Sequence, residues 1–482
     1  MVLTRNRLAE YRAALQQAES YASWLEIAKA HDEATGATDW QADDDSPHYD
    51  AGLLRRETGA LRAMRIEGDA LGLAERLTHS VYRHLNEVTT PALYQQSLAG
   101  TKRLVASFLD EVEQSLEWLA RTPIPGMSAA VKLQRFEEAW QVFGRSALML
   151  SGGATLGFYH LGVVKELFEH RLLPRILTGA STGAMIAAGV CTRDDEALAA
   201  MFADPDTIRR DGLLRVPLRL ALRRGAFLEP GQLYEVLKHN VGNFTFAEAY
   251  ARSGRVLNIS VSPTRTRQKP RLLTHLTSPD VLVASAALAS SALPGLFPPV
   301  VLQARGRDDS VRPYIPSESW VDGSLYNDLP KLRLSRLHNV NHFIVSQTNP
   351  HVLPFVSHRG KRGVLPAMFG LTSATVRTQG AHLIDVVRRA TGRGVGGLRR
   401  FADQAHALVS QDYRGDIDIH PAFHPGIYRK MVANPTRRDL DWFILQGQRA
   451  VWPQMAMIRD HTRVGRAFER CVAALRDTSG GG

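Results

Sequence analysis

Short apolar runs alternate with glycine-rich turns and amphipathic segments in the central part of this 482-residue chain. The run at 147–150 (ALML) leads into the turn Ser-Gly-Gly-Ala, and the run at 176–178 (ILT) leads into Gly-Ala-Ser-Thr-Gly. A helical pattern of apolar positions follows each turn. Short apolar runs that end at glycine are typical of buried strands. Strand, turn and helix in succession, twice over, predict an α/β fold with a parallel sheet and right-handed crossovers.

The flanking regions have helical patterns instead. Leu and Ala positions before the first apolar run recur at helical spacing, most clearly over 101–119, and Pro and Gly at 123–126 suit a boundary. The last region of the chain is basic and glycine-rich at first, and a helical pattern follows. We therefore expect three consecutive regions: a helical N-terminal domain at 1–135, an α/β domain at 136–350 and a helical C-terminal region at 351–482.

Composition narrows the setting of the protein. Hydrophobic residues make up 44% and charged residues 22%, as in a globular protein with a sizeable core. Two cysteines imply no disulfide framework, and no apolar leader is evident at the start, so we expect an intracellular protein. The uncharged stretch 281–304 is long enough to span a bilayer, but its prolines and serines favour a short buried helix followed by a loop.

The second glycine-rich turn carries candidate chemistry. Gly179-x-Ser181-x-Gly183 between a strand and a helix is the nucleophile-elbow pattern, in which small residues let the turn expose a serine hydroxyl. The helix that follows directs its N–H groups at the position where an oxyanion forms. Gly152 and Gly153 in the first turn are placed to supply further N–H donors. No Gly-x-Gly-x-x-Gly and no Lys-Ser/Thr follows them, which weakens the alternative of a phosphate-binding loop.

Two schemes supply a base for Ser181. In a triad, Asp322 and His342 follow the serine in the order used by many α/β hydrolases. In a dyad, Asp322 alone, at an Asp-Gly turn after a short strand, takes the serine proton. The pattern of residues leaves both schemes open.

The motifs together resemble those of the patatin-like phospholipase family. The central match consists of Gly152-Gly153-x3-Gly157, Gly179-Ala-Ser-Thr-Gly183 and Asp322-Gly-Ser324. Further blocks are similar to the intracellular triacylglycerol lipases of yeast and plant seeds, which carry a helical domain before the patatin domain. These blocks include Tyr21-x2-Trp24 with Asp32, Gly36 and Trp40, then Thr101-Lys-Arg-Leu104, Phe343 to His351, and Ala450-Val-Trp-Pro453.

The resemblance implies a three-layer patatin-like core with a mainly parallel sheet and helical flanks. It also implies a Ser-Asp dyad without a catalytic histidine, in which Ser181 is the nucleophile and Asp322 the base. Backbone N–H groups of Gly152, Gly153 and Ala154 would form the oxyanion hole, and no metal or organic cofactor is implied. The implied reaction is hydrolysis of neutral-lipid acyl esters, most of all triacylglycerol. Phospholipase A or lysophospholipase activity at the same site, and a non-catalytic lipid-surface scaffold, are the alternatives.

The net charge of +11 suits an anionic surface. Arginines interleave with leucines over 208–227, a pattern compatible either with a membrane surface or with an ordinary solvated helix face. A second arginine cluster lies at 388–400. We expect a lipid substrate and peripheral contact with a membrane or lipid droplet, and no nucleic acid, because no basic-aromatic reader motif is present.

Overall fold

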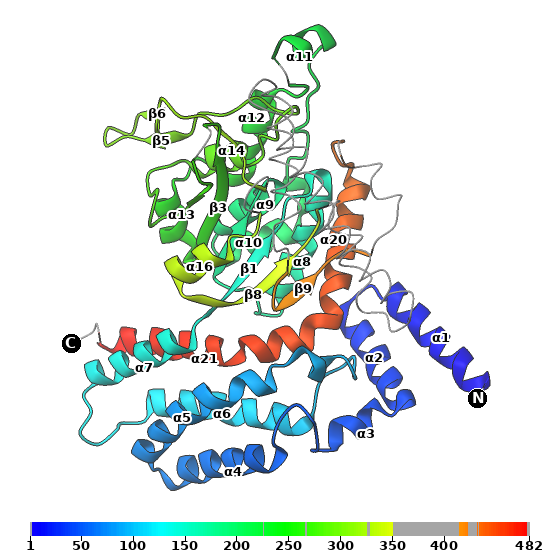
Figure 1. Ribbon diagram of the computed structural model, residues 1–482, viewed down its shortest axis with the longest axis vertical. Coiled ribbons are helices and arrows are strands. Elements are labelled where there is room, and N and C mark those ends of the chain that lie inside the picture. The colour runs from blue at the N-terminus through cyan, green and yellow to red at the C-terminus, as the bar shows by residue number, and fades with distance from the viewer. Residues whose placement is uncertain are drawn as a thin grey trace, which may run out of the picture. The chain divides into compact units, whose positions relative to one another are not determined.

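The computed structural model describes most of the chain, namely residues 2–224, 226–265, 268–324, 328–349, 414–422, 431 and 433–479. Its contacts divide the chain into two compact units (Figure 1). Unit 1 contains 1–146, 335–342 and 451–482, and unit 2 contains 147–334 and 343–450. The sequence predicted three consecutive regions. The structure has two units instead, because the end of the chain clusters with the N-terminal helices. The arginine cluster expected at 388–400 lies outside the described residues.

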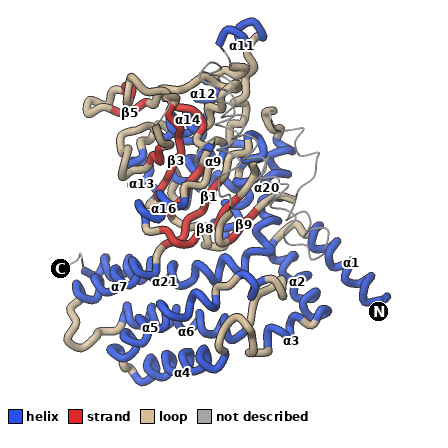
Figure 2. Tube along the Cα trace, in the orientation of Figure 1, coloured by secondary structure: helices blue, strands red, loops and turns tan. Residues whose placement is uncertain are grey.

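Unit 1 is helical, as Figure 2 shows. Its helices are α1 (Val2–Gln17), α2 (Tyr21–Thr35), α3 (Ala37–Ala42), α4 (Ala51–Glu67), α5 (Ala70–Val88), α6 (Arg103–Arg121), α7 (Ala129–Phe143) and α21 (Met455–Ser479). The central helix is α6, which buries Val105, Phe108, Leu109 and Val112 at the spacing of one helix face. This apolar face packs into a core that α4, α5 and α21 share.

Ion pairs join α21 to α6. Arg463 and Arg470 both reach Glu113, and Arg470 also pairs with Glu117 at 2.8 Å. On another side of α6, the buried Glu111 accepts hydrogen bonds from Arg65. The hydrogen bonds from the arginines lower the pKa values of Glu111 and Glu113 against the opposing effect of burial. Both carboxylates therefore stay charged and fix the helices that flank α6.

Several N-terminal residues that carry the family resemblance serve the architecture of unit 1. The buried Asp32 carboxylate accepts hydrogen bonds from the Leu98 and Ala99 N–H groups, at 3.0 and 2.9 Å. The ammonium of the buried Lys102 lies 4.5 Å from the centre of the Trp40 ring and donates to the Asp43 carbonyl. These residues hold the loops that connect the first helices.

Unit 2 contains a seven-stranded sheet in the order β4-β3-β2-β1-β8-β9, with β7 paired to β3. The pairs β1–β2, β2–β3 and β8–β9 are parallel, which confirms the predicted mainly parallel α/β sheet. The strands are β1 (Arg145–Leu150), β2 (Ile176–Gly179), β3 (Val256–Pro263), β4 (Arg271–Leu273), β7 (Trp320–Asp322), β8 (Val340–Ser346) and β9 (Ile417–Ile419). A separate ribbon pairs β5 (Gln303–Arg305) with β6 (Val311–Pro313).

Helices connect and cover these strands. They are α8 (Tyr159–Glu169), α9 (Thr182–Cys191), α10 (Asp195–Ala203), α11 (Leu218–Arg224), α12 (Pro230–Val241), α13 (Phe246–Ser253), α14 (Val283–Ser290), α16 (Lys331–His338) and α20 (Arg437–Val451). Helices α9 and α14 pack on β2 and β3. Helix α20 packs closely on α8, since a side chain at Gly162 would overlap the Ile444 carbonyl.

The stretch expected to be a short buried helix and loop has that structure. Helix α14 is eight residues long and wholly buried, and the chain then turns at Gly295, where φ is +87°. In the part of the chain that the structure describes, no helix combines the length and the apolar character needed to cross a bilayer.

Sheet register brings the two predicted catalytic residues to one place. On one edge of β3, β4 pairs with Ile259 and Val261. On the opposite edge, β2 ends with Gly179 beside Ile259, and β7 follows with Asp322 beside Val261. The elbow after Gly179 and the carboxylate of β7 therefore lie next to each other at the end of β2.

Candidate active site

Ser181 lies at the junction of β2 and α9 with φ at +53° and ψ at −127°. This backbone conformation is strained for a residue with a side chain and is typical of a nucleophile elbow. The turn is held by a buried hydrogen-bond chain: the Ser181 N–H donates to Ser290 Oγ at 3.0 Å, and Ser290 donates to the Ser260 carbonyl at 2.7 Å.

The elbow glycines are required by close packing. A Cβ atom at Gly179 would overlap the backbone of Gly183, and a Cβ at Gly183 would overlap the Leu150 carbonyl. The turn, the end of β1 and the start of α9 therefore approach each other as closely as backbone allows.

Asp322 is fully buried and lies beside the elbow. The Ser324 N–H donates to Asp322 Oδ1 at 2.8 Å, and Asp322 lines the same cavity as Ser181. Burial raises the pKa of Asp322 to about 6, although Ser324 and the neighbouring Ser181 side chain favour the charged form. A carboxylate with a raised pKa is a stronger base than an ordinary aspartate and remains ionised at neutral pH.

The glycine-rich turn after β1 lies beside Ser181, since a Cβ at Gly152 would be 3.4 Å from Ser181 Cβ. Gly153 and Ala154 line the same cavity as Ser181, and Ala154 has φ at +48°. Among the described residues, no group accepts a hydrogen bond from the N–H of Gly153 or Ala154. The Gly152 N–H, in contrast, donates to Asp328 Oδ1 at 2.9 Å.

Asp328 is a second buried carboxyl group at this site. Its other oxygen accepts from Asn349 Nδ2 at 2.5 Å. Burial raises the pKa of Asp328 to about 7, and the charge of Asp322 adds to the rise. Asp328 and Asn349 thus form a buried polar support behind the glycine turn.

Two further side chains fix this turn. The Thr182 hydroxyl donates to the Ala154 carbonyl at 2.7 Å. The buried His160 bonds to Ser346 Oγ through Nδ1 and to the Ser151 carbonyl through Nε2, at 2.7 and 3.0 Å. Burial lowers the pKa of His160 to about 4, so the ring is neutral and has a structural role.

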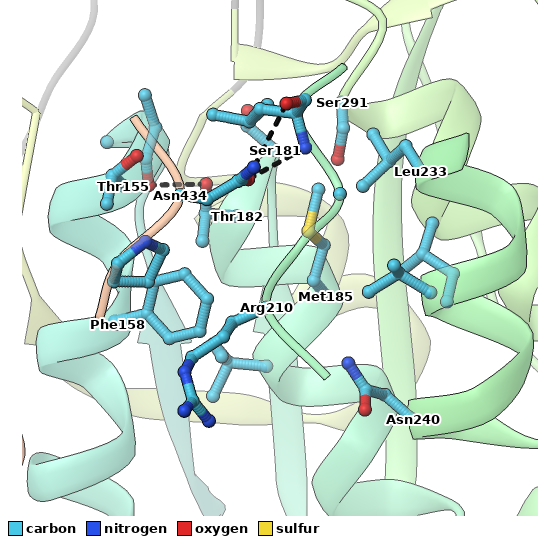
Figure 3. Close-up of a pocket in the computed structure, with 18 of the residues that line it drawn as sticks. Thr155, Phe158, Ser181, Thr182, Met185, Arg210, Leu233, Asn240, Ser291 and Asn434 are labelled. Atoms are coloured by element: carbon cyan, nitrogen blue, oxygen red, sulfur yellow. Dashed lines mark hydrogen bonds between the residues drawn. The ribbon is translucent and has the colours of Figure 1, made fainter. Parts of the chain in front are cut away.

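An apolar cavity of about 340 Å³ extends from Ser181 (Figure 3). Figure 3 shows Ser181 and Thr182 at one end, Met185 and Leu233 along the wall, and Arg210 and Asn240 at the other end. Its apolar walls include Phe158, Met185, Leu233, Leu237, Leu293 and Phe297. A cavity of this size and lining suits a hydrocarbon chain.

His342 has other partners. Its ring contacts Ser146 Oγ at 3.0 Å and His461 Nδ1 at 3.3 Å. It is not among the residues that line the Ser181 cavity. Both of these partners of the His342 ring belong to unit 1.

Sequence reasoning did not single out Ser290, Ser324, Asp328 or Asn349 as site residues. Ser290 belongs to the uncharged stretch 281–304, and Ser324 belongs to the Asp-Gly-Ser motif. Asn349 lies in the block Phe343 to His351 of the family resemblance, whereas Asp328 carried no signal of its own.

A serine at positive φ lies beside a buried carboxyl group, next to an apolar cavity and to two backbone N–H groups that have no acceptor among the described residues. This arrangement defines the class of serine ester hydrolases with a nucleophile elbow. Comparison with known proteins specifies the family. Residues 148–332 match the patatin-like phospholipase family, and residues 1–141 match a domain of unknown function, DUF3336. The chain belongs to the patatin-like phospholipase family.

Its relatives include proteins named as lipases. Triacylglycerol lipase ptl3 of Schizosaccharomyces pombe is 32% identical over 483 residues, which cover 96% of each chain. Triacylglycerol lipase SDP1L of Arabidopsis thaliana is 32% identical over 481 residues, and triacylglycerol lipase 4 of Saccharomyces cerevisiae is 30% identical over 492. The chain spans 58% and 52% of the length of these two relatives. Among solved structures, VipD from Legionella pneumophila is similar at 12% identity with a TM-score of 0.32, covering 66% of this chain and 67% of its own, which adds nothing to the assignment.

Proposed function

We propose that this chain is a serine lipase that hydrolyses acyl esters of neutral lipids, with triacylglycerol as its main substrate. The observation that carries the proposal is the placement of Ser181, held at positive φ, beside the buried Asp322 at the head of an apolar cavity. The names of the relatives from fission yeast, budding yeast and Arabidopsis support the choice of triacylglycerol.

In the proposed first step, Asp322 accepts the hydroxyl proton as Ser181 Oγ attacks the ester carbonyl carbon. The N–H groups of Gly153 and Ala154 stabilise the negative charge that develops on the carbonyl oxygen. From the sequence we expected the N–H groups of Gly152, Gly153 and Ala154 to form the oxyanion hole. We propose only the last two, because the Gly152 N–H already donates to Asp328. The tetrahedral intermediate then expels the alcohol, which leaves as diacylglycerol after taking the proton from Asp322.

The second step releases the fatty acid. Water gives a proton to Asp322 and attacks the acyl ester on Ser181, and collapse of this intermediate returns the proton to Ser181 Oγ. The apolar cavity holds the acyl chain through both steps. Lipid breakdown at a membrane or lipid-droplet surface, by peripheral contact, is the physiological setting that we propose.

The test compares the wild type with Ser181→Ala, Asp322→Asn and His342→Ala on emulsified trioleoylglycerol and on phosphatidylcholine. We expect Ser181→Ala to lower kcat at least about a thousandfold and Asp322→Asn about a hundredfold or more, with His342→Ala close to wild type. If the wild type hydrolyses phosphatidylcholine faster than trioleoylglycerol, phospholipid and not triacylglycerol is the main substrate. Hydrolysis that survives Ser181→Ala would overturn the mechanism.

A further inference from the structure

Residues 214–227 form a lobe that projects from unit 2 (Figure 1). Its helix, α11, lies beyond α12 at one end of the unit. The two ends of the lobe are joined, since the Val216 N–H donates to the Phe227 carbonyl at 3.0 Å and the Glu229 N–H donates to the Leu214 carbonyl at 2.9 Å. The lobe is thus a closed element anchored at its base.

Large apolar side chains on the lobe face the solvent. Leu214, Leu218 and Phe227 are 52%, 67% and 50% exposed. Scattered exposed leucines are common on protein surfaces, but three large apolar side chains within one small projecting element are not explained by folding.

The charges of the lobe have one sign. Arg215, Arg219 and Arg223 are exposed, and no ion pair joins them to a carboxylate in the part of the chain that the structure describes. The sequence from 212 to 228 contains no acidic residue. Exposed arginines elsewhere do pair with carboxylates, such as Arg121 with Glu117 and Arg437 with Asp441.

The lobe is continuous with the cavity of Ser181. Leu213 and Leu228, which directly flank it, both line that cavity. The base of the lobe also pairs with the segment that supplies other lining residues, because the Leu228 N–H donates to the Leu296 carbonyl at 2.9 Å. Whatever the lobe binds is therefore held next to the residues that would receive an acyl chain.

We propose that the lobe at 214–227 is a docking surface for a phospholipid layer rich in anionic headgroups. Leu214, Leu218 and Phe227 enter the boundary between headgroups and acyl chains, and the arginines pair with lipid phosphates and carboxylates. This inference deepens the proposed lipase function, and its meaning for catalysis rests on that function. Docking itself is measurable without catalysis.

The test uses co-sedimentation of the Ser181→Ala chain with phosphatidylcholine vesicles, with and without phosphatidylserine. We expect binding to vesicles that contain phosphatidylserine and a loss of binding at high salt. Replacement of Arg215, Arg219 and Arg223 by glutamine should weaken binding about a hundredfold, from the contribution of each basic residue near an anionic surface. Leu218→Glu should weaken it at least about tenfold.

Leu332→Glu is the matched control, because Leu332 is a 63% exposed leucine on α16, away from α11 (Figure 1). It should bind vesicles like the parent. If replacement of the arginines abolished binding but Leu218→Glu had no effect, the lobe would act only through its positive charge. That result would overturn the proposal. Equal effects of Leu218→Glu and Leu332→Glu, or no vesicle binding by the parent, would also overturn it.

A parallel assay in the active chain separates docking from catalysis. The same lobe variants should hydrolyse soluble p-nitrophenyl butyrate at the wild-type rate and lose activity only on lipid presented in anionic vesicles. If the wild type fails on p-nitrophenyl butyrate while lobe-dependent vesicle binding persists, the proposed function fails and the docking surface stands. If the lobe variants lose hydrolysis of p-nitrophenyl butyrate and of vesicle lipid equally, the lobe supports the structure of the active site and does not dock on lipid. That result would overturn the proposal.

Discussion

Asp328 accepts the backbone hydrogen bond of Gly152 at 2.9 Å, and the bond joins a buried carboxyl group to the turn that carries the candidate oxyanion donors. Because the Gly152 N–H is held from behind, the next two N–H groups, of Gly153 and Ala154, remain available at the cavity. A buried acceptor without its donor, or a buried donor without its acceptor, is unfavourable, so this contact constrains the path of the turn.

Removal of the Asp328 carboxyl group should therefore disturb the turn. Asp328→Ala leaves Gly152 and Asn349 without their acceptor, and we expect kcat for p-nitrophenyl butyrate to fall about tenfold to a hundredfold with little change in KM. Asp328→Asn keeps one acceptor oxygen for Gly152 and should stay within a few-fold of the wild type. A folded Asp328→Ala variant with wild-type kcat would show that the contact is not needed for catalysis.

The pH dependence of activity should report Asp322. The base must be ionised to accept the Ser181 proton, and its pKa is raised to about 6. We expect kcat/KM on a soluble ester to fall as the pH is lowered through about 6, with a single-proton slope. Asp328 is not the base in this scheme, so Asp328→Asn should keep this acid limb. A flat profile down to pH 4.5, near the ordinary aspartate range, would argue against Asp322 as the base.

Stability should change with pH in the opposite sense to activity. The folded state raises the pKa values of Asp322 and Asp328 above that of an unfolded aspartate, so it favours their neutral forms. The stabilisation is complete below the unfolded pKa and is lost as the pH rises through about 6 and 7. We expect the thermal midpoint of unit 2 to fall by a few degrees between about pH 5 and pH 8 in the wild type, and by less in Asp328→Asn. Scanning calorimetry at the two pH values measures the shift in each protein. Equal shifts in the wild type and Asp328→Asn would contradict this prediction.

The sequence identifies the elbow because its chemistry is local. Gly179, Ser181 and Gly183 lie within five residues, and the strand before them and the helix after them are visible as apolar patterns. The carboxylate at 322 was found from its Asp-Gly turn and the family resemblance. Its position beside the elbow follows from the shared edge of β3, which no local pattern encodes.

Other features depend on contacts between distant segments and were not predicted. Asp328 reaches Gly152 across 176 positions of sequence. The clustering of α21 with the N-terminal helices depends on its packing and ion pairs with α6, more than 330 positions away. An amphipathic pattern shows that a helix buries one face, but not which other helix covers that face.

Packing at the elbow predicts a contrast between two glycines of α9. An added methyl group at Gly183 would overlap the Leu150 and Ser151 carbonyls, whereas one at Gly189 would find only Arg193 Nη1 at 3.7 Å. We expect Gly183→Ala to destabilise unit 2 by about 3 kcal/mol or more and to abolish activity. Gly189→Ala should be neutral or stabilise the helix by roughly 0.5–1 kcal/mol. Thermal unfolding of both variants tests the contrast, and similar midpoints for the two would contradict the close approach of β1 and α9.

The wall of the cavity offers control over acyl-chain length. Met185 lines the cavity and is only partly buried, and Figure 3 shows its side chain between Ser181 and the far end marked by Arg210 and Asn240. A larger side chain there can occupy the cavity without displacing a fully packed core. We expect Met185→Trp to lower kcat/KM for trioleoylglycerol relative to tributyrylglycerol by about tenfold or more, since loss of a few buried methylenes changes discrimination on that scale. Met185→Leu, which nearly conserves volume, is the control and should keep the wild-type ratio. If Met185→Trp lowered both rates equally, the acyl chain would not pass Met185, and the chain-binding role of this cavity would have to be abandoned.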